Sequence, residues 1–91
     1  MNQTRILNDL EELAERLGLR VRYEKLENGE HEAVSGRYRL RAEEILLIDR
    51  RLDPAGRIAV LSRELSRMDL GGVFVKPYLR DLLETGADSP A

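Results

Sequence analysis

Cysteine and tryptophan are both absent from this 91-residue chain, and histidine occurs once. Without cysteine the chain has no disulfide, no thiolate nucleophile and no cysteine-based zinc or iron–sulfur site. His31 has no second histidine or cysteine with which to share a metal ion, and we interpret it as a surface residue. The composition therefore predicts neither a cofactor nor a metal.

Long apolar runs are lacking as well. The longest, Ile45-Leu46-Leu47-Ile48, falls far short of the roughly 20 residues that a membrane-spanning helix needs. The first residues show no charged segment followed by an apolar stretch, as a secretory leader would. We therefore expect a soluble, cytoplasmic protein that does not bind membranes.

Charge of either sign is frequent but nearly balanced, because 15 Lys and Arg stand against 17 Asp and Glu and leave a net charge of −2. A net-negative chain gains no general attraction to a phosphate backbone, so charge alone does not predict nucleic-acid binding. Leu, Ile, Val and Phe together exceed the roughly 20% below which chains tend to stay disordered. The length fits one domain, which we place at residues 1–85, with a disordered tail at residues 86–91.

Apolar residues at helical spacing predict three helices. Thr4 is the expected N-cap of the first, and Gly18 stands where a helix end favours glycine. Asp53 followed by Pro54 predicts the start of the second, because aspartate caps well and the first helical position needs no N–H. The predicted helices cover residues 5–17, 54–69 and 77–84.

Alternating or continuous apolar residues predict three β-strands, at residues 19–24, 36–41 and 45–48. In the second strand we place Tyr38 and Leu40 on the core face. Residues 28–35 are interpreted as a loop. The connections are too short for a crossover helix, which favours antiparallel pairing. The expected fold class is α+β: an N-terminal helix, a three-stranded antiparallel sheet, a second helix and a short C-terminal helix, with the first two helices on one face of the sheet.

The second predicted helix contains Arg63-Glu64-Leu65-Ser66-Arg67. These residues have the frame of H-E-x-x-H, in which two histidines one helical turn apart hold zinc and the glutamate acts as general base. Arginine stands at both histidine positions. A guanidinium stays protonated and has no lone pair to offer, so two of them would repel a divalent cation. We predict no metal site and no catalytic residue here.

The order of elements around this motif resembles the compact core of the HExxH metallopeptidases, the zincins, and especially the small IrrE/ImmA-like group. The resemblance covers roughly residues 1–70 and is carried by Ile48-Asp49, Leu52-Asp53-Pro54, Ile58-Ala59-Val60-Leu61, Glu64 and Leu65. Because both ligand positions depart from the family's pattern, it implies neither zinc nor peptide hydrolysis for this chain. It implies a shared scaffold.

The motif residues are also the first candidate binding site: Arg63, Glu64 and Arg67. The alternative is that Glu64 and Arg67 form an i,i+3 ion pair on a solvated helix face, worth a few tenths of a kcal/mol. Sequence leaves both interpretations open.

The second candidate site is a row of cations on one predicted strand, made by Arg37, Arg39 and Arg41. Joined by Arg20 and Arg22 across the sheet, such a row could hold phosphates or an acidic partner. The alternative is a polar outer sheet face whose charges are balanced by glutamates on neighbouring strands.

These observations favour a non-catalytic interaction domain, on a degenerate metallopeptidase-like fold, that acts through protein–protein contacts with an unidentified partner. The alternative function is anion or nucleic-acid binding through the arginine-rich sheet face. One sheet face and the apolar link Val73-Phe74-Val75 are expected to be partly uncovered in so small a chain. We therefore expect self-association, most simply as a two-fold dimer.

Overall fold

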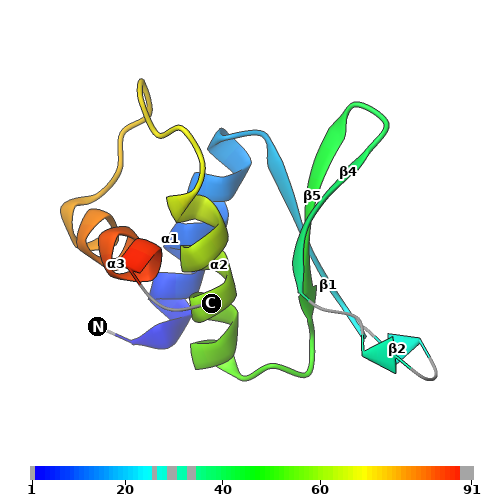
Figure 1. Ribbon diagram of the computed structural model, residues 1–91. Coiled ribbons are helices and arrows are strands. Elements are labelled where there is room, and N and C mark those ends of the chain that lie inside the picture. The colour runs from blue at the N-terminus through cyan, green and yellow to red at the C-terminus, as the bar shows by residue number, and fades with distance from the viewer. Residues whose placement is uncertain (1, 26, 29–30, 33–34, 89–91) are drawn as a thin grey trace.

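The computed structural model describes residues 2–25, 27–28, 31–32 and 35–88. Its helices are α1 (Gln3–Arg16), α2 (Pro54–Ser66) and α3 (Pro77–Asp88), and its strands are β1 (Leu19–Glu24), β2 (Glu27–Asn28), β3 (His31–Glu32), β4 (Gly36–Leu40) and β5 (Glu43–Asp49) (Figure 1). The predicted α+β class is confirmed. β2 and β3 pair antiparallel within the region that was expected to be a loop.

The three-stranded sheet has the order β1-β5-β4, so the last strand in sequence lies in the middle. β5 pairs parallel with β1 and antiparallel with β4. The prediction of a purely antiparallel sheet is therefore wrong in this detail. No crossover helix is needed between β1 and β5, because β4 runs back antiparallel to both and returns the chain to the start of β5. β5 then lies between the two earlier strands.

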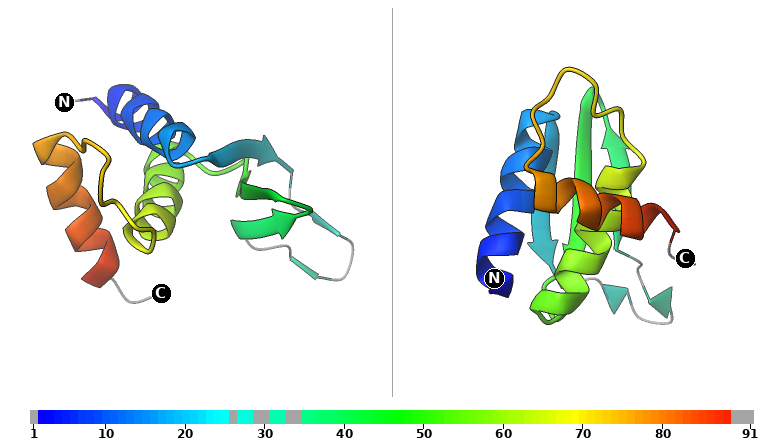
Figure 2. Two further views of the ribbon diagram at one scale, coloured as in Figure 1. Left: turned by 90° about the horizontal axis from the view of Figure 1, so that it is seen from above. Right: turned by 90° about the vertical axis from the view of Figure 1, so that its left-hand side faces the viewer.

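Helices α1 and α2 cover one face of this sheet, and α3 contacts α2 on the side away from the sheet (Figure 2). The largest fully buried side chains come from α1, β5 and α2: Leu10, Leu46, Ile48, Leu61 and Leu65. Within the described part of the chain, no helix covers the opposite side of the sheet, which we call the outer face.

Side-chain alternation assigns the residues of β5 to the two faces. Leu46 and Ile48 belong to the hydrophobic core, so they point toward the helices. Ile45 therefore points to the outer face, and it is only 6% exposed although it lies outside the core cluster. The parallel register places Arg20 beside Ile45 and Arg22 on the same face.

The antiparallel register with β5 sets the faces of β4. Tyr38 pairs with Ile45, so Tyr38 and Leu40 lie on the outer face, where they are 47% and 59% exposed. Their prediction as core residues is wrong. Alternation correctly indicates which residues share a face, but it does not indicate which face the helices cover. Arg37 and Arg39 therefore lie on the helix side of this edge strand.

Helix α1 begins earlier than predicted, because Asn2 and not Thr4 is its N-cap. The Oδ1 of Asn2 accepts a hydrogen bond from the backbone N–H of Arg5 at 2.8 Å. At the other end Gly18 has a φ of 80°, a backbone conformation that glycine adopts without strain.

Helix α2 begins as predicted. The Oδ1 of Asp53 accepts a hydrogen bond from the N–H of Gly56 at 2.8 Å, and Pro54 is the first helical residue. α2 ends at Ser66, before the predicted end at residue 69, while α3 continues beyond residue 84. The predicted tail at 86–91 begins inside α3, and its residues 89–91 lie outside the described residues. None of the described helices is long and apolar enough to span a membrane.

Candidate functional site

The candidate site on α2 places Glu64 between two arginines. The Oε2 of Glu64 lies 3.5 Å from the Nε of Arg63 and 3.5 Å from the Nη1 of Arg67. The Glu64 side chain is 8% exposed, whereas the Arg67 side chain is 56% exposed. The three predicted residues are thus close together, and Arg67 donates a hydrogen bond to Glu64. A buried carboxylate that faces two neighbouring guanidiniums presents little surface to a ligand.

The surroundings of Glu64 hold little further chemistry. In the residues that the structure describes, no three His, Cys, Asp or Glu side chains are placed to hold a metal ion. Ser66 donates its hydroxyl to the carbonyl of Arg63 at 2.7 Å. The hydroxyl of Ser62 is buried and has no hydrogen-bond partner in the described chain.

The three arginines of the second candidate site do not form one row. Arg37 lies on the helix side of β4, 3.7 Å from Glu44, and Arg39 is directly opposite Glu44 in the register. Arg41 has a φ of 59° and lies in the turn between β4 and β5, outside the strand. Arg20 and Arg22 are on the outer face of β1, which does not neighbour β4. The expected continuous basic face is therefore divided between two sides of the sheet.

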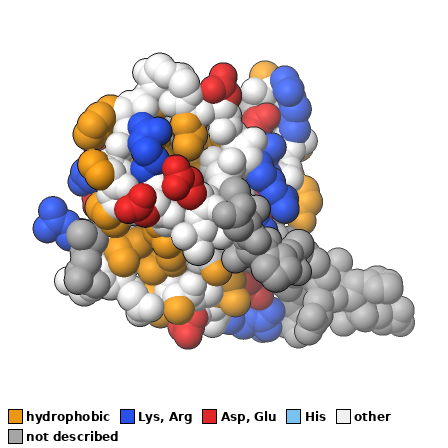
Figure 3. Space-filling model, turned by 60° about the vertical axis from the view of Figure 1, so that its left-hand side comes forward, with side chains coloured by type: hydrophobic (Ala, Val, Ile, Leu, Met, Phe, Trp, Pro, Cys, Tyr) orange, Lys and Arg blue, Asp and Glu red, His pale blue; other side chains and the backbone are white. Residues whose placement is uncertain are grey.

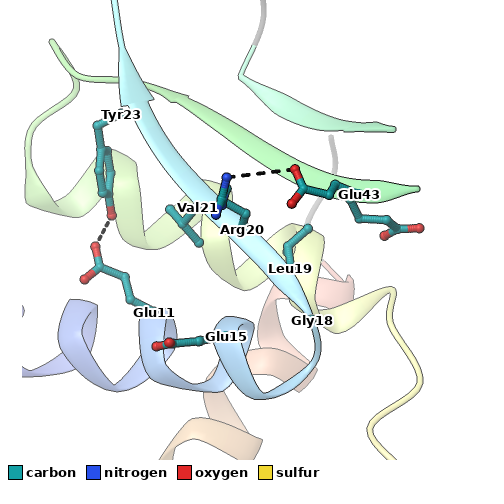
Figure 4. A pocket seen from close by; sticks show the side chains of 9 residues that line it. Glu11, Glu15, Gly18, Leu19, Arg20, Val21, Tyr23 and Glu43 are labelled. Carbon is teal, nitrogen blue, oxygen red and sulfur yellow. Dashed lines mark hydrogen bonds and ion pairs between the residues drawn. The ribbon is translucent and has the colours of Figure 1, made fainter. Parts of the chain in front are cut away.

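A hollow that the sequence did not predict lies between α1 and the free edge of β1. We call it the α1–β1 groove, and its volume is about 510 Å³. Its lining comes from α1, from the turn and strand that follow, and from the start of β5: Glu11, Glu15, residues 18–21, Tyr23, Glu43 and Glu44. Figure 4 shows the α1 glutamates on one side of β1 and Glu43 beyond it on the other.

Hydrogen bonding and charge define the chemistry of the α1–β1 groove. Four glutamates and one arginine give its lining a formal charge of −3. The Tyr23 hydroxyl donates a hydrogen bond to Glu11 across the groove (Figure 4), and burial together with this bond raises the pKa of Tyr23. The guanidinium of Arg57 lies 4.8 Å from the centre of the Tyr23 ring, a cation–π distance. Arg20 is 3.8 Å from Glu43.

Local sequence patterns indicate only some of the residues that line this groove. Glu11 and Glu15 are four residues apart in a helix, so they share a side of α1. Glu43 and Glu44 join them only because β5 pairs parallel with β1, which places Glu44 beside Leu19. The parallel pairing of β5 with β1 cannot be predicted from local sequence patterns.

Apolar side chains are also exposed away from the sheet. Phe74, in the link before α3, is 70% exposed, while its neighbour Val75 is buried. Figure 3 shows hydrophobic side chains at the surface on the side of the molecule that carries α3, interspersed with charged ones. The predicted apolar link is thus partly uncovered, through Phe74.

Comparison of the chain with protein-family models, with curated proteins and with solved structures finds no match.

Proposed function

We propose that this chain is a non-catalytic domain that works through protein–protein contacts, with the outer face of the sheet as its contact surface. One observation supports this proposal above others: in the described residues, helices cover a single face of the sheet, while the other face displays Tyr38 and Leu40 at 47% and 59% exposure. Sheets normally bury an apolar face against a second layer, and exposed apolar patches are characteristic of interaction sites.

The occupant that fits this face is a second copy of the chain. The outer face has arginines on β1 and the exposed Tyr38 on β4, on opposite sides of β5. A two-fold axis parallel to β5 would place β1 of one copy over β4 of the other. Arg20 and Arg22 would then face the partner's Tyr38, and a guanidinium stacks favourably on an aromatic ring.

The area of the outer face limits the affinity of this dimer contact. Strands about 4.8 Å apart, with about 3.3 Å per residue, give three strands of this length an area of roughly 300 Å². Stable interfaces bury about 800 Å² per partner. We therefore expect a weak, reversible dimer that forms at high protein concentration.

Sedimentation equilibrium over a range of protein concentrations tests this surface. The average mass of the unmodified chain should rise with concentration, and Tyr38→Lys should abolish the rise because it removes the ring and places a cation against the partner's Arg20 and Arg22. Phe74→Lys is the matched control, since it makes the same kind of change at an aromatic residue that is even more exposed, at 70%, and lies away from the sheet. A mass that stays monomeric at high concentration, or an equal effect of both variants, would contradict the proposed contact.

The non-catalytic part of the proposal is tested with zinc. Because Glu64 is flanked by two guanidiniums, stoichiometric zinc should leave the thermal unfolding temperature unchanged. Stabilisation by zinc that disappears in Glu64→Gln would contradict it. The resemblance to the zincin scaffold stays a prediction, and so does anion binding by Arg37, Arg39 and Arg41. The structure divides these three arginines between a strand face and a turn.

A further inference from the structure

The free edge of β1 lies along the α1–β1 groove. β1 is at one end of the strand order β1-β5-β4, so no strand of the described sheet pairs with its other edge. Neighbouring residues of a strand point to opposite faces, yet residues 18–21 all line the groove. The groove therefore reaches both faces of β1 near its start, where Glu43 and Glu44 of the neighbouring β5 also line it. An open strand edge presents N–H and C=O groups with which a further strand can pair.

The chemistry of the groove selects the kind of strand. Val21, which is only partly buried, supplies apolar contact along the edge, while four glutamates against one arginine give the formal charge of −3. The side chain of Glu15 is exposed and forms no ion pair or hydrogen bond with other described residues. The pair between Arg20 and Glu43, at 3.8 Å, is more than half exposed on both sides and is therefore weak.

We propose that the α1–β1 groove binds an extended, basic segment of a partner protein, which adds to the sheet as a further strand beside β1. Main-chain hydrogen bonds to the edge would supply affinity, and the glutamates would select lysine or arginine side chains. Alternate side chains of the added strand would point toward Glu11 and Glu15 on α1, so a basic residue at every second position fits best. The proposal is independent of the dimer contact, because the outer face and the groove are different surfaces.

The probe is a capped, fluorescently labelled six-residue peptide that alternates lysine and valine, and the full chain is the receptor. Fluorescence anisotropy at low ionic strength should show saturable binding that weakens as salt is added. A peptide that alternates glutamate and valine should not bind. A third peptide keeps the lysines but carries N-methyl groups on alternate amides, which blocks strand pairing without changing charge; in one of the two methylation registers it should lose binding.

Two protein variants with the same change of charge locate the site. Glu15→Lys reverses an exposed charge in the groove and should weaken binding by about fivefold or more. Glu12→Lys is the matched control, because Glu12 is on the same helix, pairs with Arg16 at 2.7 Å and does not line the groove. Hydrogen exchange followed by NMR on the bound protein should show new protection of amides in β1, the signature of an added strand.

Several results would overturn the proposal. Equal loss of affinity in Glu15→Lys and Glu12→Lys would show only general attraction to an acidic surface. Binding of both N-methylated registers, or no new protection in β1, would exclude strand addition. A second copy is the competing occupant, because β4 is also an edge strand with Arg37 and Arg39. If β4 of one copy added to β1 of the next, the contact would repeat from copy to copy and form open-ended oligomers. Such oligomers, abolished by Glu15→Lys, would show that the groove binds a second copy of the chain and not a segment of a partner protein.

Discussion

Asp9 of α1 accepts hydrogen bonds from Lys76, just before α3, and from Tyr78 in the first turn of α3, and the Nζ of Lys76 lies 3.0 Å from its Oδ1. The bond from Tyr78, followed by that from Lys76, holds the pKa of Asp9 below its ordinary value of 3.8. A carboxylate with a lowered pKa stabilises the fold above the ordinary value, and this contribution disappears as the pH falls through the folded-state value.

Replacement of this carboxylate should therefore change the acid response. In Asp9→Asn, the free energy of unfolding should depend less on pH below about 4 than it does in the unmodified chain. Urea unfolding at a series of acidic pH values measures this dependence. Asp81→Asn, an exposed carboxylate of α3, is the control. Identical acid profiles for Asp9→Asn and the unmodified chain would show that Asp9 does not link α1 to α3 energetically.

Tyr23 should give the opposite response, at alkaline pH. Burial and the hydrogen bond to Glu11 raise its pKa, so its stabilising contribution is complete below the unfolded-state value of about 10 and is lost as the pH rises beyond it. Tyr23→Phe should make the alkaline fall in stability less steep. In a titration of phenolate absorbance, Glu11→Gln should move the ionisation of Tyr23 to lower pH, and an unchanged titration would rule out the Glu11 contact.

The assignment of sheet faces predicts unequal costs for two leucine truncations. Leu46→Ala removes a fully buried side chain and should lower the free energy of unfolding by about 2–5 kcal/mol. Leu40→Ala, at 59% exposure, should change it by about 0.5 kcal/mol or less in dilute, monomeric protein. Chemical denaturation measures both. Similar costs would mean that the outer face is covered in the folded chain.

Two serines of α2 offer a second matched comparison. Ser62 buries a hydroxyl without a partner, so Ser62→Ala should leave the stability unchanged or raise it by up to about 1 kcal/mol. Ser66 donates to the carbonyl of Arg63 at 2.7 Å, and Ser66→Ala should cost about 0.5–1.5 kcal/mol. Thermal unfolding of the two variants distinguishes them, and a destabilised Ser62→Ala would show that its hydroxyl does have a partner.

Features that depend on neighbouring residues were predictable from the sequence. Asp53 and Pro54 start α2 because a cap and a first helical turn need only four consecutive residues. The cluster of Arg63, Glu64 and Arg67 was predictable for the same reason, since residues three apart in a helix are neighbours.

Features that depend on strand pairing were not predictable. The faces of Tyr38 and Leu40 follow from the register of β4 with β5 and from the position of the helices, which no local pattern contains. The separation of Arg37 from Arg20 has the same origin, because β5 lies between their strands. The α1–β1 groove was missed since its residues come from three elements that parallel pairing brings together.

The central position of β5 also bears on how this chain acquires its structure. A nascent chain that ends before Glu43 contains β1 and β4 but lacks the strand that joins them, because neither pairs with the other in the finished sheet. The sheet can therefore assemble only after β5 has left the ribosome, together with the α2 segment that follows and covers it. Until then neither early strand has its native partner, and their arginine side chains would discourage premature association with strands of other molecules.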